Sequence, residues 1–486
     1  MSAPTSHQPA RAAGGRKLMF VSTVACQVLA LLRNILVARM LGPHEFGIAA
    51  VIILTIAFMD SLAAAGPQNL VIQAKDDDRK SLLGAAHSVT VIRGVGTSVM
   101  LLALAAPISQ LFGLELSWAA IVGLSVSSLL LGFVHHGTRM VQRDGDFRPD
   151  ALTQLGAEAA ALVVAVAAAF VTKSHMAIVV GLIARSAVTV AMSQWLSPQK
   201  YGFNWTKSYL AQFWSFGWPL LINGPLLFFA AQADRLFISR ELGVAVLGVY
   251  SAVMVLITSP SNAIMRWLGT SFTPALAKAF HDEGRLATKG VVYDFTALFV
   301  VSAFLMFAGF AAIGAEATHL LFGKDFATSA ALVALVGLLQ ILRYLRAWTS
   351  TFAIAVAASR GILISTIVRL AALPLGYVGL RVMGGLPGLL TGFIAGEVIA
   401  LVVSQLIVNR NAGRSLLEGV NTTVTFCVLA GGLIFLLPLL DASLVLRILA
   451  GGVIGLVGAA LLLATISTGE TVARAGPLLA KLRHRL

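Results

Sequence analysis

Long apolar stretches recur along the whole sequence, and they restrict the chain to one kind of environment. Fourteen of them can be placed between clusters of glycine, proline and charged residues. A helix needs about 20 apolar residues to cross the hydrocarbon core of a bilayer. Only 12% of the residues are charged, whereas a soluble domain carries about a quarter. The pattern predicts an all-α integral membrane protein with about 14 transmembrane helices and excludes a water-soluble protein.

The predicted spans leave no room for a sizeable soluble domain, because the connections between them are short. The two longest, 210–239 and 327–357, exceed the length that a perpendicular helix needs, so tilting or kinking near Pro219 and Pro225 is expected. The spans lie near residues 18–40, 46–66, 81–106, 117–134, 150–171, 175–195, 210–239, 244–268, 290–313, 327–357, 361–382, 386–408, 420–439 and 443–467.

The distribution of basic residues decides the meaning of the formal net charge of +14. If the N-terminus lies in the cytoplasm, the inner segments hold 21 Lys and Arg residues and the outer segments hold five. Inner loops of membrane proteins are enriched in Lys and Arg. The asymmetry predicts a multi-pass protein of the inner membrane with both termini in the cytoplasm, and it explains the charge without nucleic acid. Residues 1–17 are predicted to be a retained cytoplasmic tail and not a cleaved signal peptide.

An internal repeat relates the two halves of the chain. The segment LVARMLGPHEFGIAAV at 36–51 aligns with FISRELGVAVLGVYSA at 237–252, at an offset of 201 residues. Each segment contains R-x-L-G and a further glycine five residues later, and these glycines are expected to allow tight turns or close helix packing. The corresponding residues are Arg39 with Arg240, Gly42 with Gly243, and Gly47 with Gly248.

The repeat predicts the domain organisation. Six spans separate the two segments, so both halves begin on the same side and form parallel six-helix lobes, as in transporters with parallel repeats. The first lobe is predicted at 18–209 and the second at 210–410, and residues 411–486 supply two more helices and a basic cytoplasmic tail.

Ionisable residues inside the predicted spans form an unbalanced set. Such residues are costly at membrane depth and usually face a bundle interior or an aqueous cavity. Arginines exceed carboxylates by four, so several need a wet cavity or an anionic ligand. The basic residues are Arg33, Arg93, Arg185, Arg235, Arg266, Arg343, Arg346, Arg369 and Arg447, and the acidic residues are Asp60, Glu158, Asp234, Asp294 and Glu397.

Some of these residues are better cavity candidates than others. Arg266, Asp294 and Arg447 lie close enough to span ends to reach the interface. In the first span, Thr23, Gln27 and Asn34 share one helical face with Arg33 beside it. The substrate-binding candidates are therefore Arg33, Asn34, Arg93, Arg185, Arg235, Arg343, Arg346 and Arg369, and the coupling or gating candidates are Asp60, Glu158, Asp234 and Glu397.

Two pairings among these candidates are open from the sequence. Glu158 can form a structural bridge with Arg185 or Arg93, and Arg33 can pair with Asp234 across the two repeats. The planar guanidinium donates two parallel hydrogen bonds and stays charged, which suits a phosphate group. A phosphorylated lipid headgroup is therefore a natural ligand for the arginines.

No pattern for covalent or metal chemistry stands out, so neither enzymatic activity nor a cofactor is expected. His135 and His136 have no partner at metal-ligand spacing, and a loop role is favoured. The run Asp76 to Asp78 is flanked by basic residues and reads as a solvated loop. Walker and G-x-S-x-G motifs are missing from the sequence. Cys26 and Cys427 lie far apart in apolar runs and predict no disulfide.

Four segments together resemble a known family. They read RNILVARMLGPHEFGIAAVI, GPQNLVIQAKDD, MVQRDGDFRPDAL and ADRLFISRELGVAVLGVYSAV. They are similar to the Wzx-type oligosaccharide flippases, in particular the colanic acid and exopolysaccharide exporters, over about residues 15–410. This family belongs to the MOP superfamily, with the multidrug-and-toxin extruders (MATE) and the lipid II flippases.

The resemblance implies a mechanism as well as a fold. It implies two six-helix lobes around a central cavity and transport of undecaprenyl-diphosphate-linked oligosaccharide units from the inner to the outer leaflet. By helix and pseudo-symmetry it places Arg33, Asn34, Asp60, Asp234, Arg235 and Arg266 at the cleft. Membrane lipids and, as protein partners, a polysaccharide polymerase and co-polymerase are implied, with the flippase itself a monomer.

Other functions stay open at this stage. A lipid II flippase shares the fourteen-helix plan, but its early Arg-Asp pair is not matched in the first span. A multidrug cation exporter would prefer an acidic cavity. A glycosyl polymerase or ligase normally carries a large outer loop, and a scaffold for the polysaccharide machinery would not move lipid at all.

Overall fold

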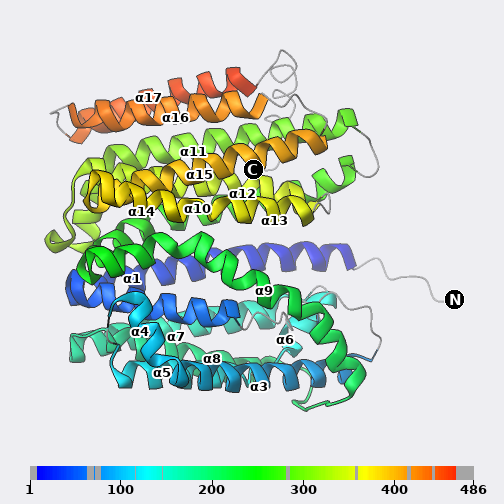
Figure 1. The fold of residues 1–486 in the computed structure, drawn as a ribbon. Helices are drawn as coiled ribbons and strands as arrows, with labels where there is room; N and C mark the ends of the chain where they lie inside the picture. The colour runs from blue at the N-terminus through cyan, green and yellow to red at the C-terminus, as the bar shows by residue number, and fades with distance from the viewer. Residues whose placement is uncertain are drawn as a thin grey trace. The chain divides into compact units, whose positions relative to one another are not determined.

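Helices are the only regular secondary structure in the part of the chain that the computed structural model describes (Figure 1). It describes residues 8–62, 71, 78–114, 116–144, 146–280, 285–355, 359–412, 418–439 and 444–466. Within these ranges there is no β-strand, which confirms the all-α prediction. Most of the predicted tail 1–17, Asp76, Asp77 and the basic tail after residue 466 lie outside the ranges or are described only in their backbone.

The helices form two compact units, residues Met1–Ala252 and Val253–Leu486. The first unit holds α1 (Gln8–Leu62), α3 (Arg79–Ala103), α4 (Ala105–Phe112), α5 (Trp118–Leu131), α6 (Gly137–Met140), η1 (Val141–Asp144), α7 (Arg148–Thr172), α8 (Met176–Leu196), α9 (Lys207–Phe237), η2 (Ile238–Leu242) and the start of α10 (Val244–Lys278). The second holds the rest of α10, α11 (Arg285–Phe322), η4 (Lys324–Phe326), α12 (Ala330–Ala355), α13 (Ser359–Arg369), α14 (Ala372–Met383), α15 (Gly385–Ala412), α16 (Glu418–Leu439) and α17 (Leu444–Ile466).

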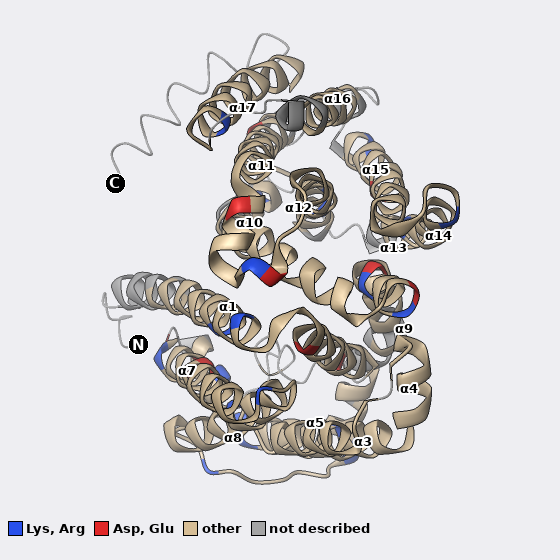
Figure 2. Cartoon of the chain, turned by 90° about the vertical axis from the view of Figure 1, so that its left-hand side faces the viewer, with Lys and Arg blue, Asp and Glu red and all other residues tan. Residues whose placement is uncertain are grey.

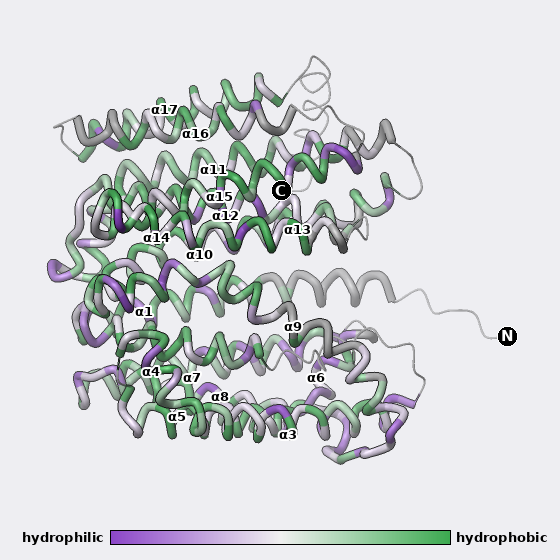
Figure 3. Tube along the Cα trace, in the orientation of Figure 1, coloured by the Kyte–Doolittle hydropathy of each residue, from purple (hydrophilic) through white to green (hydrophobic). Residues whose placement is uncertain are grey.

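The surfaces of these helices match a hydrocarbon environment. In the described part of the chain, ten helices are long and apolar enough to cross a membrane, and two shorter apolar helices accompany them. Apolar side chains point outward along several of them, for example Val163, Phe170 and Leu456, each more than 60% exposed. Apolar residues dominate the tubes of Figure 3 and charged residues are sparse in Figure 2. The protein is a multi-pass membrane protein.

Each predicted apolar span overlaps a helix, but some helices are joined, divided or extended relative to the predicted spans. The spans 18–40 and 46–66 are joined in α1, which breaks only at Gly42, where φ is 76° and ψ is 173°. The span 361–382 is divided into α13 and α14 at Leu370 and Ala371. Pro374 lacks the N–H that would bond to the Leu370 carbonyl, so the helix cannot continue regularly across this point.

Each unit has its own packed core. In the second unit, aromatic side chains of α11 and α12 stack on one another, with Phe299 and Tyr344 ring centroids 4.9 Å apart. Small residues allow close helix packing in the first unit, where Gly181 of α8 lies against Ala165 of α7. The helix α9 bends along its length, which holds both Pro219 and Pro225 (Figure 1). These rigid bundles position the buried charges.

Candidate functional site: two arginine clusters

Glu158 on α7 is the centre of a charged cluster in the first unit. Its carboxylate accepts a hydrogen bond from Arg33 on α1 at 3.1 Å and forms an ion pair with Arg185 on α8 at 2.8 Å. Of the alternatives that the sequence left open for Glu158, the structure selects Arg185 and adds Arg33. The Arg185 side chain remains 50% exposed in this ion pair.

A second ion pair lies beside this centre. Arg93 on α3 is 3.8 Å from Asp60, which lies near the end of α1 and is 54% exposed. Asp60 also interacts electrostatically with Arg185, so the three ion pairs form one group, called here cluster 1: Arg33, Arg93, Arg185, Asp60 and Glu158. It contains three cations and two anions and carries one net positive charge. The Asn34 side-chain oxygen next to it is buried with no hydrogen-bond partner among the described residues.

A more unbalanced group lies in the second unit. Glu397 on α15 is 1% exposed and is approached by three arginines. Arg369 on α13 donates to its Oε1 at 2.8 Å, Arg343 on α12 donates to the same oxygen at 3.1 Å, and Arg346 lies 3.5 Å from Oε2. This group, called here cluster 2, carries two net positive charges. Its arginines are only 5–13% exposed.

The helical spacing explains how cluster 2 forms. Arg343 and Arg346 are three residues apart and therefore lie on one face of α12. Arg369 is the last residue of α13, directly before the break at Leu370, and this places its guanidinium against α15. The sequence identified all four members as candidates, but it gave no signal that they would meet in one place.

The candidates Asp234 and Arg235 lie on α9, next to the π-helical turn η2. Asp234 is fully buried and accepts a hydrogen bond from Tyr250. The Arg235 Nε is buried without a hydrogen-bond partner in the described part of the chain. Arg33 pairs with Glu158 in this structure, and the pairing of Arg33 with Asp234 stays a prediction. Tyr250 was not singled out by the sequence.

The two R-x-L-G segments adopt the same geometry, as the alignment suggested. Gly42 and Gly243 both have positive φ, 76° and 93°, with extended ψ, which only glycine adopts readily. A Cβ on Gly47 would overlap the carbonyl oxygen of Val244, and a Cβ on Gly248 would overlap that of Pro43. Since Pro43 and Val244 also correspond at the offset of 201, this contact, called here the glycine seam, is reciprocal.

The predicted interfacial residue Arg447 has an ion-pair partner that the sequence analysis missed. It pairs with Glu316, which links α17 to α11. Both side chains are partly exposed, at 24% and 33%. The predicted span ended at residue 313, so Glu316 lay outside it. The observed helix α11 is longer and reaches Phe322.

Three histidines form a buried cluster in the first unit. His87 donates from Nδ1 to the Gly202 carbonyl at 2.9 Å and accepts at Nε2 from the His136 backbone N–H at 3.3 Å. His135 and His136 are 2% and 1% exposed, and burial lowers the pKa of both, that of His136 far below 6.5. These neutral rings hold the loop before α6 against α3. Among the described residues no group of three or more His, Cys, Asp or Glu is placed to hold a metal ion.

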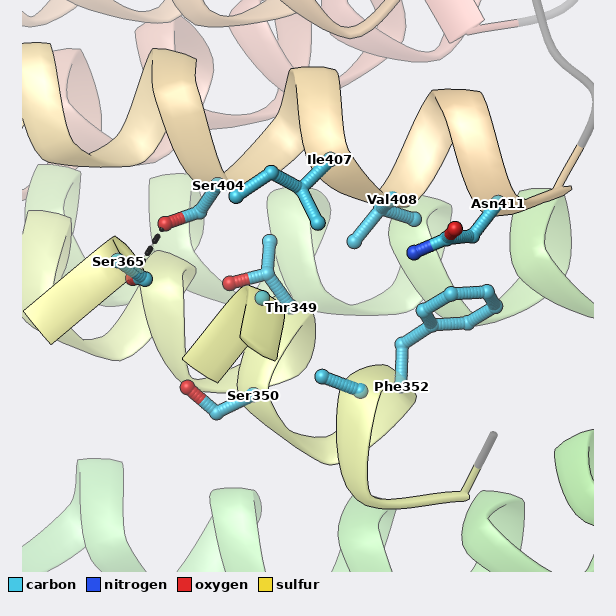
Figure 4. Close-up of a pocket in the computed structure, with 10 residues that line it drawn as sticks. Thr349, Ser350, Phe352, Ser365, Ser404, Ile407, Val408 and Asn411 are labelled. Atoms are coloured by element: carbon cyan, nitrogen blue, oxygen red, sulfur yellow. Dashed lines mark hydrogen bonds between the residues drawn. The ribbon is translucent and has the colours of Figure 1, made fainter. Parts of the chain in front are cut away.

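A small pocket with a mixed lining lies between α12, α13 and α15 (Figure 4). Its cavity volume is about 10 Å³, which is room for about one water molecule. Ser365 and Ser404 share a hydrogen bond of 2.7 Å at one end, and Asn411 and Phe352 lie at the other. The sequence gave no indication of it, because each hydroxyl taken alone looks like an ordinary helix residue.

Comparison with known proteins decides the family. The profile of the family described as "Polysaccharide biosynthesis protein" matches residues 36–331, more than half of the chain. The chain belongs to this family. The assignment confirms the resemblance that the repeated segments carried.

Three relatives with curated descriptions share 23–24% of their residues with this chain over the matched segments. A membrane protein in the cps region of Klebsiella pneumoniae is 23% identical over 63% of this chain and 63% of its own length. The lipopolysaccharide biosynthesis protein WzxC of Escherichia coli (strain K12) is 24% identical over 56% of each chain. The succinoglycan biosynthesis transport protein ExoT of Rhizobium meliloti (strain 1021) is 24% identical over 60% of this chain and 58% of its own length. The matches thus span less than two thirds of these relatives.

Solved structures of the MOP superfamily share the fold of this polysaccharide biosynthesis family member. The lipid II flippase MurJ in an inward closed conformation gives a TM-score of 0.64 at 14% identity, covering 91% of this chain and 98% of that one. A multidrug resistance MATE transporter in an inward-facing conformation gives 0.63 at 15% identity, covering 80% and 94%. At this identity the likeness shows the fold alone.

Proposed function

We propose that this protein is a flippase that moves undecaprenyl-diphosphate-linked oligosaccharide units from the inner to the outer leaflet for polysaccharide export. The family and the names of WzxC and ExoT support a role in polysaccharide transport. The MurJ- and MATE-like fold supports movement by alternating access. The function is transport and not enzymatic catalysis.

The observation that carries the proposal is the excess of arginine in both clusters. Among the described ion pairs, three arginines share two carboxylates in cluster 1 and three arginines share one carboxylate in cluster 2. Uncompensated cations inside a membrane protein are costly unless an anion or water serves them. A lipid-linked diphosphate carries negative charge on both phosphoryl groups, and arginine forks bind such oxygens in pairs. A cation exporter would need the opposite balance, so a multidrug exporter fits less well.

A lipid II flippase is the second candidate, because its substrate also carries a diphosphate. The structural likeness to MurJ favours it. The family assignment and the curated relatives favour the oligosaccharide unit instead.

The fold is proposed to have fourteen membrane crossings, in two six-helix lobes with an added pair. The break at Gly42 divides the 42-residue apolar part of α1, Val21–Leu62, into two lengths that each suffice for a crossing. The repeated geometry of the R-x-L-G segments supports lobes that begin at residues 18 and 210. The charge asymmetry of the loops supports an inner-membrane protein with both termini in the cytoplasm.

The glycine seam is proposed to close the outer side of the transport path. The contact joins two backbones without interdigitating side chains, so it can separate and re-form without repacking a core. In this orientation the seam lies on the outer side, at the break within α1 and at the start of α10. Its opening would expose the path to the outer leaflet.

The membrane potential can assist this transport. Moving one net negative charge outward releases about 2.3 kcal/mol per 100 mV of inside-negative potential. Asp60, Glu158, Asp234 and Glu397 stay proposed as coupling or gating residues, with Arg33, Asn34, Arg93, Arg185, Arg235, Arg343, Arg346 and Arg369 as the substrate-binding set. A monomer that hands its product to a polymerase and co-polymerase completes the proposal.

A reconstitution experiment tests the function. Purified protein is placed in liposomes that contain a polyprenyl-diphosphate trisaccharide with a fluorescent sugar, and a membrane-impermeant quencher is added outside. Without a flippase only the outer half of the label is quenched, whereas with the protein nearly all of it is expected to be quenched within minutes. Quenching that stops at half in both samples would exclude flippase activity for this substrate.

A further inference from the structure

The connection between α8 and α9, residues 197–206, is called here the strap. It contains no helix, and it runs beside the start of α3, which holds it in place (Figure 1). His87 of α3 donates from Nδ1 to the Gly202 carbonyl at 2.9 Å. The Asn204 side chain donates to the Ser81 carbonyl of α3 at 3.1 Å. These two anchors fix the backbone of the strap on the first unit.

The exposed side chains of the strap include two aromatic rings. Phe203 and Trp205 are 51% and 55% exposed, and their ring centroids lie 6.2 Å apart with the planes 25° from parallel. Tyr201 begins the same row, because its ring lies 5.4 Å from that of Phe203 and stacks on His87 at 4.2 Å. Since the rings rest on one another and on α3, little further conformational entropy is lost when they bind a partner.

The neighbouring helices place the strap at a bilayer surface. The helix α8 is long and apolar enough to cross a membrane and ends at Leu196, directly before the strap. Trp195 in its last turn is 80% exposed, and Trp214, about two turns after the start of α9, is 66% exposed. Exposed tryptophans at such helix ends are typical of the headgroup level. Non-helical backbone does not lie against hydrocarbon, so the strap lies at the surface, on the cytoplasmic side in the proposed orientation.

Lysines flank the aromatic rings of the strap. Lys200 precedes them and Lys207 follows them, and both are exposed. Lys80 in the first turn of α3 adds a third exposed cation, next to the carbonyl that Asn204 contacts. The nearby Asp78 carboxylate caps α3 by accepting from the Ser81 N–H. The negative surface potential of a cytoplasmic leaflet attracts basic residues of this kind, so the charge of the strap is complementary to acidic phospholipids.

We propose that the strap binds the surface of the cytoplasmic leaflet and selects acidic phospholipids there. Phe203 and Trp205 insert among the headgroups, level with the adjoining helix ends. Lys200 and Lys207 bind the acidic headgroups. Through its anchors on α3, the strap ties the helix that carries Arg93 of cluster 1 to the membrane surface. The inference goes beyond transport and uses only the proposed orientation of the chain.

Fluorescence quenching tests the depth of the strap. The full-length protein with Cys26→Ala and Cys427→Ala has no cysteine left, so one new cysteine can carry a bimane probe in vesicles of phosphatidylcholine and phosphatidylglycerol. At Phe203→Cys, a nitroxide near the headgroup should quench the probe at least threefold more strongly than a nitroxide at the end of the acyl chain. Gly96→Cys, inside the α3 span, where a Cβ meets no atom within 4 Å, is the deep control and should show the reverse order.

A water control completes the depth measurement. Asp146→Cys, on the exposed connection before α7, should be quenched weakly by both nitroxides. A probe at Phe203→Cys that behaves like the one at Asp146→Cys would overturn the proposal, because the strap would then stand in water and face a soluble partner. Quenching like that at Gly96→Cys would overturn it as well, because the rings would then lie in hydrocarbon.

The same probe at Phe203→Cys tests the choice of lipid. The shallow nitroxide is carried in equal amount either by phosphatidylglycerol or by phosphatidylcholine, in vesicles of the same overall composition. The acidic carrier is expected to quench at least twice as strongly, and Lys200→Gln with Lys207→Gln should make the two carriers equal. Lys173→Gln with Lys324→Gln is the matched control, since it removes two exposed lysines from the proposed outer side and should keep the preference.

Two outcomes of the lipid measurement would contradict the proposal. One is equal quenching by both carriers in the protein with its strap lysines intact. The other is a preference for the acidic carrier that survives the replacement of both strap lysines. Neither quenching measurement involves transport, so failure of the liposome flipping experiment would leave their results standing.

Discussion

Clusters 1 and 2 contain the same residue types but differ in the ratio of arginines to carboxylates and in the exposure of their side chains. In cluster 1 two carboxylates serve three arginines, and Arg185 and Asp60 are half exposed. In cluster 2 one carboxylate serves three arginines, and all four side chains are 1–13% exposed. An arginine that is both paired and exposed can exchange partners with little loss, whereas a buried one cannot. The difference suggests that cluster 1 is open to ligand in this conformation and that cluster 2 is closed.

The largest expected effect compares the two central carboxylates. Glu397→Gln leaves three buried arginines without a counter-ion, and such a loss typically costs about 3–5 kcal/mol. Glu158→Gln leaves Arg33 and Arg185 beside Asp60 and water, so its cost should be clearly smaller. Thermal unfolding of the two purified variants measures the difference. Equal destabilisation would remove the distinction between the clusters.

The glycine seam extends the comparison to the two repeats. Gly47→Ala and Gly248→Ala each place a methyl group on the opposite carbonyl oxygen, and both should reduce flipping at least tenfold while the protein still inserts. Because the contact is reciprocal, the two variants should behave alike. Gly96→Ala is the control, since a Cβ there meets no atom within 4 Å. Normal flipping by either seam variant would show that the contact is dispensable.

The arginine substitutions in cluster 1 are expected to have the next largest effect. Arg33→Ala combined with Arg93→Ala should abolish polymer export from cells while the protein remains in the membrane, because both forks are lost from the open cluster. Arg33→Lys should restore export only partly, since an ammonium keeps the charge but not the fork. Arg447→Ala, which breaks only the partly exposed pair with Glu316, is the control and should have little effect. Normal export by the double variant would exclude a diphosphate site there.

The smallest effect concerns the neutral histidine cluster, which contrasts with the charged clusters. Burial keeps the pKa of His136 far below 6.5, with His87, His135, Arg93 and Arg139 adding repulsion. Below pH 6.5 the unfolded chain binds more protons than the folded one, so stability is present above that pH and is lost on acidification, by about 1.4 kcal/mol per pH unit. His136→Asn should reduce the pH dependence of the melting temperature between pH 5 and pH 7.5, and the buried His135 should keep part of it. His319→Asn, at an exposed position, should leave this pH dependence unchanged. An equal pH dependence of the melting temperature in the unmodified protein and in both variants would show that His136 does not cause the loss of stability at low pH.

The sequence predicted the helices well, because apolar length is a local property. The lengths between glycine, proline and charge clusters placed every span on a helix, and the R-x-L-G alignment anticipated the matching geometry at Gly42 and Gly243. It could not predict which charged side chains form ion pairs with one another. Glu158 forms ion pairs with both Arg33 and Arg185, and Glu397 forms ion pairs with arginines of α12 and α13. Which side chains meet depends on the rotation and tilt of the helices, and the sequence does not give these. The pocket at Ser365 and Ser404 depends on the same packing.

The substrate headgroup offers the most direct test of the central claim, that arginines select a lipid-linked diphosphate. The liposome measurement is repeated with the same trisaccharide on a polyprenyl diphosphate, on a polyprenyl monophosphate and on a neutral polyprenyl ether. The account predicts flipping rates that fall at least tenfold from the diphosphate to the monophosphate and further for the neutral lipid. It also predicts that Arg33→Ala with Arg93→Ala removes most of the difference. Equal rates for all three lipids would contradict the account, because the sugar or the tail would then be what the protein recognises.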